Sequence, residues 1–211
     1  PQAALATLLI ASMPVGIAAA AMSQLCGGTV SLALISTIIT HMIAPLTVPL
    51  TFALLTNVSM QIDIMDMAIS LFLTLSIPAV IYAFSAHYIP PLKTWLQRNG
   101  QASSIVLIGA MVAVVIAARR EFFATDITLL ITAAIIGCVL YALMYVAGWA
   151  SGLWRDDTYR INCAIMSGTN NIGLAAALAV LYFPDATILL VIVGGEVGWI
   201  IGVDVCKRLA H

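Results

Sequence analysis

The stretch Ser167–Gly173, which reads SGTNNIG, interrupts a long apolar segment of the chain. About ten apolar residues follow it and a comparable apolar stretch precedes it. In hydrocarbon, backbone groups that leave a helix must find partners inside the protein or in a wet cavity. The stretch therefore predicts a membrane helix that breaks near mid-depth. An alternative interpretation is that Asn170 and Asn171 only hold neighbouring helices together.

The composition of the whole chain supports a membrane location. The sequence is 63% hydrophobic and 8% charged, whereas soluble domains average about 45–50% apolar and about 25% charged residues. A formal net charge of -1 leaves no basic surface for nucleic acid. The expected partners are the lipid bilayer and a small-molecule solute.

Apolar runs between polar breaks predict about seven membrane spans, joined by short connections. Helices are favoured over a barrel because residues 105–118 are apolar at every position, whereas membrane strands alternate polar and apolar positions. We expect an all-α polytopic membrane protein formed by a single domain, residues 1–211. The predicted spans are Ala3–Leu25, Val30–Leu55, Ala68–Tyr88, Ser104–Ala118, Ile127–Leu153, Ile161–Phe183 and Ala186–Val205.

The basic residues predict the orientation of these spans. When the loops are assigned alternately to two sides, one side carries most of the Lys and Arg, which marks the cytoplasm. That side holds Lys93, Arg98, Arg155, Arg160, Lys207 and Arg208, and the other holds Arg119 and Arg120. We therefore expect a multi-pass protein of the cell (inner) membrane with a cytoplasmic carboxyl terminus. Because the chain opens in apolar sequence, we also expect an incomplete transporter that has lost an odd number of earlier helices.

A second break is predicted in the first span, where Pro14 and Gly16 lie near the middle. Gly16 stands twelve positions before the turn at Gly28, and Gly173 stands eleven before the turn at Pro184. Two interrupted helices in matching contexts indicate a repeated unit and a transporter site between them. The alternative for Pro14 is a simple kink.

Two ionisable side chains fall at mid-depth. Glu196 lies twelve positions beyond Pro184, a rise of about 18 Å, so it is a candidate for ion coupling. His41 lies twelve positions after Thr29, one turn from Thr37, at the corresponding place in the suspected repeat. The alternatives are a protonated Glu hydrogen-bonded between helices and a neutral, packed His.

Two motifs of the chain carry a family resemblance. They are NIGLAAALA at Asn171–Ala179 and PVGIAAAAM at Pro14–Met22. They resemble N-S-G-L-A-A-A-L-A and P-G-G-T-A-S-N-V-M of the bile acid:sodium symporter family. Val30–Pro49 is similar to the helix that follows. The resemblance runs from Ala4 to about Val205 and implies the fourth to tenth of ten helices, with broken fourth and ninth helices that cross. It also implies core-like helices over residues 1–56 and 124–206 and panel-like helices over 60–120.

The chain departs from this family where the family binds sodium. The resemblance places Asn170 where the family has Gln, and it retains Thr37 and Asn171. Four family ligand positions instead hold Ala or Met, namely Ala19, Ala20, Ala33 and Met166. Because hard cations prefer several oxygen ligands, we expect sodium coupling to be weakened or lost.

The sequence thus predicts a secondary active transporter of a small organic anion that works by alternating access. We expect no enzyme activity, no metal site and no cofactor beyond sodium or a proton as coupling ion. The predicted solute-binding residues are Pro14, Gly16, Thr169, Asn170 and Asn171, and the predicted ion-coupling residues are Glu196, His41 and Thr37.

Two alternatives remain open at this point. One is an efflux permease of the arsenite or auxin-carrier type, although no Cys stands near Pro14 to bind arsenite as a thiolate. The other is a non-transporting sensor or degenerate fragment, because ligands carried by missing helices could be essential.

Overall fold

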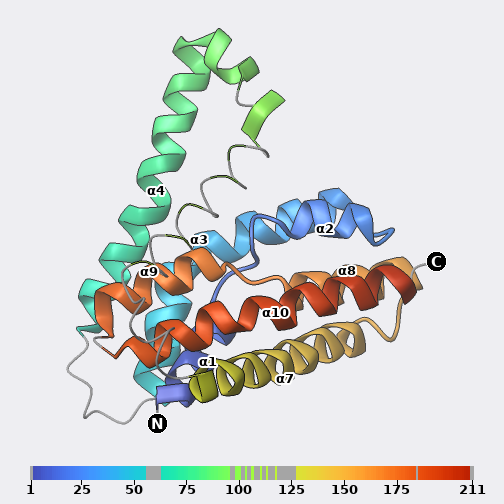
Figure 1. Cartoon of the computed structure of the whole chain (residues 1–211). Coiled ribbons are helices and arrows are strands. Elements are labelled where there is room, and N and C mark those ends of the chain that lie inside the picture. Colours follow the sequence, from blue (N-terminus) through green and yellow to red (C-terminus); the bar gives the residue numbers. More distant parts are fainter. Residues whose placement is uncertain are drawn as a thin grey trace.

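The computed structural model describes residues 2–55, 63–95, 98–100, 127–183 and 185–209, together with single helical positions at 103, 106, 110, 113 and 117. The elements are shown in Figure 1. They are α1 (Gln2–Ser12), α2 (Ala19–Leu25), α3 (Val30–Leu55), α4 (Ile64–Tyr88), α7 (Ile127–Ser151), α8 (Asp157–Gly168), α9 (Ile172–Tyr182) and α10 (Ala186–Leu209). Most of the predicted span 104–118, the turn at Pro184, and Arg119 and Arg120 fall outside the described residues.

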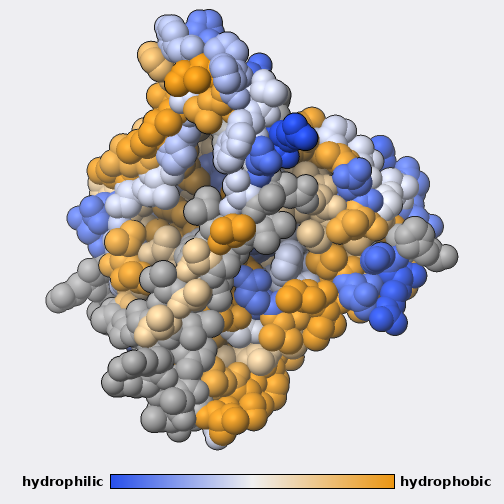
Figure 2. Space-filling view, turned by 45° about the horizontal axis from the view of Figure 1, so that its top comes forward, coloured by the Kyte–Doolittle hydropathy of each residue, from blue (hydrophilic) through white to orange (hydrophobic). Residues whose placement is uncertain are grey.

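Four described helices are long and apolar enough to cross a membrane, within Val30–Leu55, Ile64–Tyr88, Leu130–Ser151 and Thr187–Leu209. The pairs α1–α2 and α8–α9 each occupy one further predicted span. Figure 2 shows broad apolar areas on one face, with hydrophilic residues gathered near the far end of α4 and near the carboxyl terminus. An apolar belt between polar ends is what lipid contact requires. The prediction of an all-α polytopic membrane protein is confirmed.

Both predicted breaks are present. The first span leaves the helix over residues 13–18, between α1 and α2, and the sixth leaves it over residues 169–171, between α8 and α9. The second break is shorter than the predicted Ser167–Gly173. It ends early because the side chain of Asn171 caps α9, with Oδ1 accepting a hydrogen bond from the Leu174 N–H at 3.0 Å.

The two breaks cross and pair through their backbones. Val15 and Asn170 form an antiparallel bridge. The Gly16 N–H donates to the Thr169 carbonyl at 2.5 Å, and the Asn171 N–H donates to the Pro14 carbonyl at 2.9 Å. Groups freed from two helices thus satisfy one another inside the protein, as the hydrocarbon setting demands. A Cβ atom on Gly16 would lie 2.8 Å from the Asn170 carbonyl oxygen, so glycine permits this approach.

This pairing defines a pseudo-two-fold relation between the halves of the chain. It maps position 15 onto 170, and the same shift of 155 positions carries the start of α1 onto the start of α8. Contacts repeat accordingly, since α2 packs on α3 and α8 while α9 packs on α10 and α1. The shift pairs His41 with Glu196, as predicted. It pairs Gly16 with Asn171, however, so matching Gly16 with Gly173 was wrong by two positions.

The α7–α10 seam is the most extensive packing between described helices. Small residues allow it, because a Cβ on Gly198 would lie 2.7 Å from the Cα of Cys138. By contrast, α4 stands away from this bundle and packs along α3 (Figure 1). It also meets α9, where the Tyr182 hydroxyl donates to Asp66 Oδ2 at 2.8 Å.

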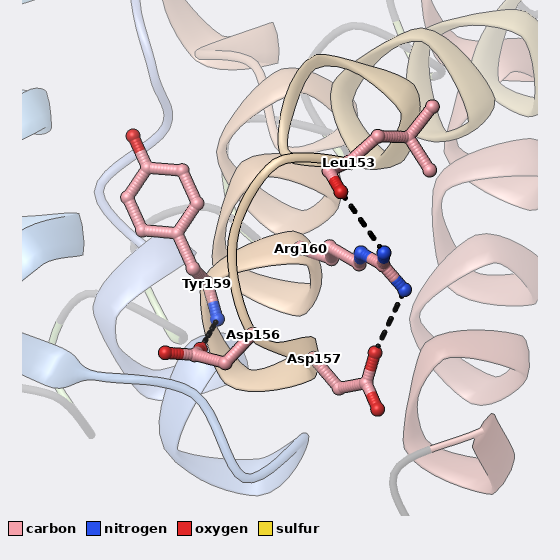
Figure 3. A network of polar contacts seen from close by, with 5 residues as sticks. All are labelled: Leu153, Asp156, Asp157, Tyr159 and Arg160. Carbon is pink, nitrogen blue, oxygen red and sulfur yellow. Dashed lines mark hydrogen bonds and ion pairs between the residues drawn. The ribbon is translucent and has the colours of Figure 1, made fainter.

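A polar turn joins α7 to α8 (Figure 3). The Arg160 guanidinium donates to the Asp157 carboxylate at 2.9 Å and to the Leu153 carbonyl at 3.0 Å. Asp156 caps α8 by accepting from the Tyr159 N–H at 2.8 Å. These bonds end α7 and start α8. They fix the direction of the α8 half-helix, which places Thr169 at the crossing.

Candidate functional site

Asn171 stands at the centre of the candidate site, just beyond the crossing. While its Oδ1 caps α9, its Nδ2 lies 3.0 Å from His41 Nε2 on α3. The other ring nitrogen, His41 Nδ1, lies 2.8 Å from the Thr37 carbonyl oxygen, which can only accept. The bonds therefore assign a neutral imidazole with its proton on Nδ1, and Nε2 accepts from the amide.

A cavity of about 620 Å³ opens beside these residues, between α3, α4 and the two breaks. Ile17, Thr37, His41 and Asn171 line one side, and α4 adds the hydroxyls of Thr74 and Ser76. The remaining lining is largely apolar and includes Met42, Pro45, Phe72 and Leu75. Such a volume with a few convergent polar groups is typical of a small-molecule site. The structure thus brings three predicted residues, Thr37, His41 and Asn171, to one cavity.

Thr169 and Asn170 occupy the crossing itself and do not line this cavity. Asn170 Nδ2 donates to the Ile10 carbonyl at 2.7 Å, satisfying the end of α1. The Trp199 indole N–H donates to Thr169 Oγ1 at 3.3 Å. Both side chains are buried. These contacts tie the second break to α10 and to the end of α1, and the proposed contact of both side chains with solute stays a prediction.

Pro14 and Gly16 contribute through their backbones, as the pairing at the crossing shows. Sequence reasoning missed Thr40, whose hydroxyl accepts from the Val15 N–H at 3.1 Å and so ties α3 to the first break. Thr40 precedes His41 directly, but a threonine in a helix can donate to the preceding turn of its own helix, as Thr40 does to the Ser36 carbonyl, and so carries no distinguishing signal. The hydroxyls of Thr74 and Ser76 were missed for the same reason.

Glu196 takes the place on α10 that His41 takes on α3, but it does not line the cavity. The carboxylate is half-buried and lies near the phenol of Tyr141. The Tyr141 hydroxyl is buried and has no hydrogen-bond partner among the described residues. Glu196 and His41 thus lie on different helices, and they do not share the cavity. A role for Glu196 in ion coupling alongside His41 and Thr37 therefore stays a prediction.

Four of the positions where the resemblance expects sodium ligands hold Ala or Met and offer no side-chain oxygen. Ala19 and Ala33 are fully buried and Met166 is half-buried. Among the described residues, no group of three or more His, Cys, Asp or Glu is arranged to hold a metal ion.

An all-α bundle in which two broken helices cross beside a cavity has the architecture of interrupted-helix membrane proteins. The model of the Sodium Bile acid symporter family matches residues 1–126, more than half of the sequence, and the chain belongs to this family. The match covers the first broken helix, α3 and α4.

The chain is also similar to the uncharacterized protein YbaS of Bacillus subtilis (strain 168). The two are 25% identical over 186 residues, which cover 86% of this chain and 60% of the relative. The chain therefore spans less than two thirds of the length of the relative it matches.

Proposed function

We propose that the protein is a secondary active transporter of a small organic anion, with the solute bound in the cavity between α3, α4 and the crossing. One observation carries the proposal: Thr37, His41 and Asn171 converge on a cavity of about 620 Å³ at the point where two helices break. Irregular backbone at membrane depth is a feature of transporter binding sites. Membership of a family named for bile acid symport supports the same class of solute.

The cavity has the chemistry of an amphipathic ligand site. Its apolar walls suit the carbon skeleton of an organic solute, while the Asn171 amide and the hydroxyls of Thr37, Thr74 and Ser76 supply hydrogen bonds. Thr169, Asn170, Pro14 and Gly16 then hold the breaks in register behind the site.

Alternating access follows from the division of the helices. We propose that residues 1–56 and 124–206 form the core and that residues 60–120 form a panel that moves against it. α4 packs mainly along α3, and both helices line the cavity. A shift of α4 relative to α3 would therefore open the cavity to one side. The bond between Tyr182 and Asp66 is one contact that such a shift would break.

We propose that transport is coupled to protons and not to sodium. Ala19, Ala20, Ala33 and Met166 supply no side-chain oxygen for a hard cation. Glu196 and His41, at equivalent places on α10 and α3, are the proposed proton carriers. The protein would act in the cell (inner) membrane with its carboxyl terminus in the cytoplasm.

Uptake of radiolabelled cholate into proteoliposomes of the full-length protein tests the proposal. Thr37→Ala and Asn171→Ala should each lower uptake by at least about tenfold, because each removes a hydrogen-bonding group from a charged solute's site. Thr47→Ala on the same helix is the matched control, because its exposed hydroxyl bonds only the Ile43 carbonyl of its own helix. Normal uptake by both cavity variants would show that the site lies elsewhere.

The second candidate is an efflux permease of the arsenite or auxin-carrier type. None of the residues lining the cavity is a cysteine, which disfavours a thiolate site for arsenite. Efflux of the same probe from loaded vesicles, compared with uptake, separates the two directions of transport.

A further inference from the structure

Both polar atoms of the Asn171 amide have hydrogen-bond partners. Its oxygen accepts from the Leu174 N–H, and its nitrogen donates to His41 Nε2. On the far side of the ring, His41 Nδ1 donates to the Thr37 carbonyl. A single line of hydrogen bonds thus runs from α3 through the imidazole to the first turn of α9, and it is complete only when His41 is neutral.

A proton added to His41 changes this arrangement. Nε2 then carries a hydrogen and faces the Asn171 Nδ2 donor at 3.0 Å, so two donors oppose one another. Rotating the amide by half a turn would give Nε2–H an oxygen. The same rotation would turn the amide nitrogen toward the Leu174 N–H and remove the cap on α9. The protein alone therefore cannot satisfy both groups when His41 is charged.

An anion can satisfy both. A carboxylate that bridges His41 Nε2–H and Asn171 Nδ2 from the cavity side would accept from each donor, and the α9 cap would remain intact. Both side chains line the cavity, so a solute carboxylate can reach them from that side. A charged imidazolium in an apolar cavity needs such a counter-charge.

His41 is the ionisable residue of the cavity lining. The helices packed against α3 carry other titratable or charged groups, but none of these lines the cavity. They are Asp66, Tyr82, His87 and Tyr88 on α4, and Asp157, Tyr159, Arg160 and Cys163 on α8. The described residues of α1 and α2 carry none, and Tyr182 on α9 bonds Asp66.

We propose that the cavity binds a proton and a carboxylate together. When His41 is neutral, its ring and the Asn171 amide bond one another and offer no donor to an anion. When His41 is protonated, the ring and the amide each offer a donor, and together they bind a carboxylate. One proton from water is taken up on Nε2 for each carboxylate bound, so the charge on the occupied site does not change. This inference rests on the proposed function, since it specifies the solute class and the coupling ion of the same cavity.

Binding of cholate to the purified full-length protein tests it, measured by calorimetry at pH 8.0 and pH 6.5 in buffers of different ionisation enthalpy. Carboxylates remain ionised throughout this range, because their ordinary pKa is about 4. The wild type should bind up to about thirtyfold more tightly at pH 6.5 and take up close to one proton per cholate, because linkage of one proton changes affinity by about tenfold per pH unit and the two conditions lie 1.5 units apart.

His41→Gln should bind weakly at both pH values and take up no proton, because the Gln oxygen accepts from Asn171 as the neutral ring does. His87→Gln, at the end of α4 and away from the cavity, is the matched control and should behave as wild type. Asn171→Asp keeps an acceptor oxygen for the α9 cap but replaces the donor nitrogen Nδ2 with a carboxylate oxygen. This variant should therefore lose cholate binding at both pH values.

Affinity that does not change with pH, or proton uptake that persists in His41→Gln, would overturn the inference and leave the proposed transport function standing. Conversely, pH-dependent binding without any uptake of cholate by proteoliposomes would overturn the transport function and leave the inference standing.

Discussion

At the scale of single residues, Gly16 allows the backbones of two broken helices to meet. A methyl group there would lie 2.8 Å from the Asn170 carbonyl oxygen and 3.0 Å from that of Thr169. Gly16→Ala should therefore destabilise the protein by about 1–3 kcal/mol, as overpacking typically does, and should abolish uptake. Thermal unfolding in detergent measures the first effect. Gly100→Ala is the control, because a Cβ atom on Gly100 meets nothing within 4 Å; equal melting temperatures for the two variants would contradict the prediction.

Glu196 is the second residue with a specific expectation. Glu196→Gln removes the half-buried carboxylate near Tyr141 but leaves the cavity lining intact. Accumulation of cholate driven by an imposed pH gradient should fall, whereas exchange without a gradient and the pH dependence of cholate binding should remain. Gradient-driven accumulation equal to that of the wild type would rule out Glu196 as a proton carrier.

Sequence reasoning singles out residues whose polarity conflicts with the membrane, and their roles in binding and coupling stay predictions. Asn171, His41 and Thr37 are polar groups at mid-depth in apolar segments, and the structure gathers them at one cavity. Thr40 and Tyr141 could not be predicted in the same way. Thr40 bonds a residue 25 positions away, and the burial of Tyr141 depends on how α7 packs against α10.

At the scale of elements, Asn162 fixes the start of α3. Its Oδ1 accepts from the Thr29 N–H at 3.0 Å, and the side chain is fully buried. Asn162→Ala should therefore lower the free energy of unfolding by about 1–3 kcal/mol, because the Thr29 N–H at the start of α3 loses its hydrogen-bond partner. Asn99→Ala, which removes an exposed amide that bonds the Trp95 carbonyl, should change it little. Thermal unfolding of both variants checks this expectation, and an unchanged midpoint for Asn162→Ala would contradict it.

The breaks in two helices could be predicted, but their register could not. Pro14 and the asparagine pair mark the places where helix fails, and the structure breaks both helices there. The sequence pattern aligned Gly16 with Gly173 because both are glycines beside a break. The backbone instead pairs Gly16 with Thr169 and relates it to Asn171, since the crossing is set by backbone hydrogen bonds between the two breaks and not by residue type.

At the scale of the whole molecule, the prediction concerns the driving ion. Replacing external sodium with choline should change cholate uptake by the intact protein by less than about twofold, because a hard cation needs several oxygen ligands and four expected positions hold Ala or Met. Uptake measured with and without a sodium gradient, at constant pH, provides the check. A strong sodium dependence would mean that backbone or other side-chain oxygens replace the family's ligands.

The shift of 155 positions that relates the two halves also bears on the resting state of the molecule. If the halves were identical, exchanging their roles would convert an outward-facing conformation into an inward-facing one of the same energy, and the empty protein would populate both equally. Every unlike pair under the shift, such as His41 with Glu196 or Thr40 with Gly195, removes that degeneracy. Under the proposed alternating access, the preferred side of the unloaded cavity therefore depends on the positions at which the two halves differ, and exchanging the members of one such pair should shift that preference.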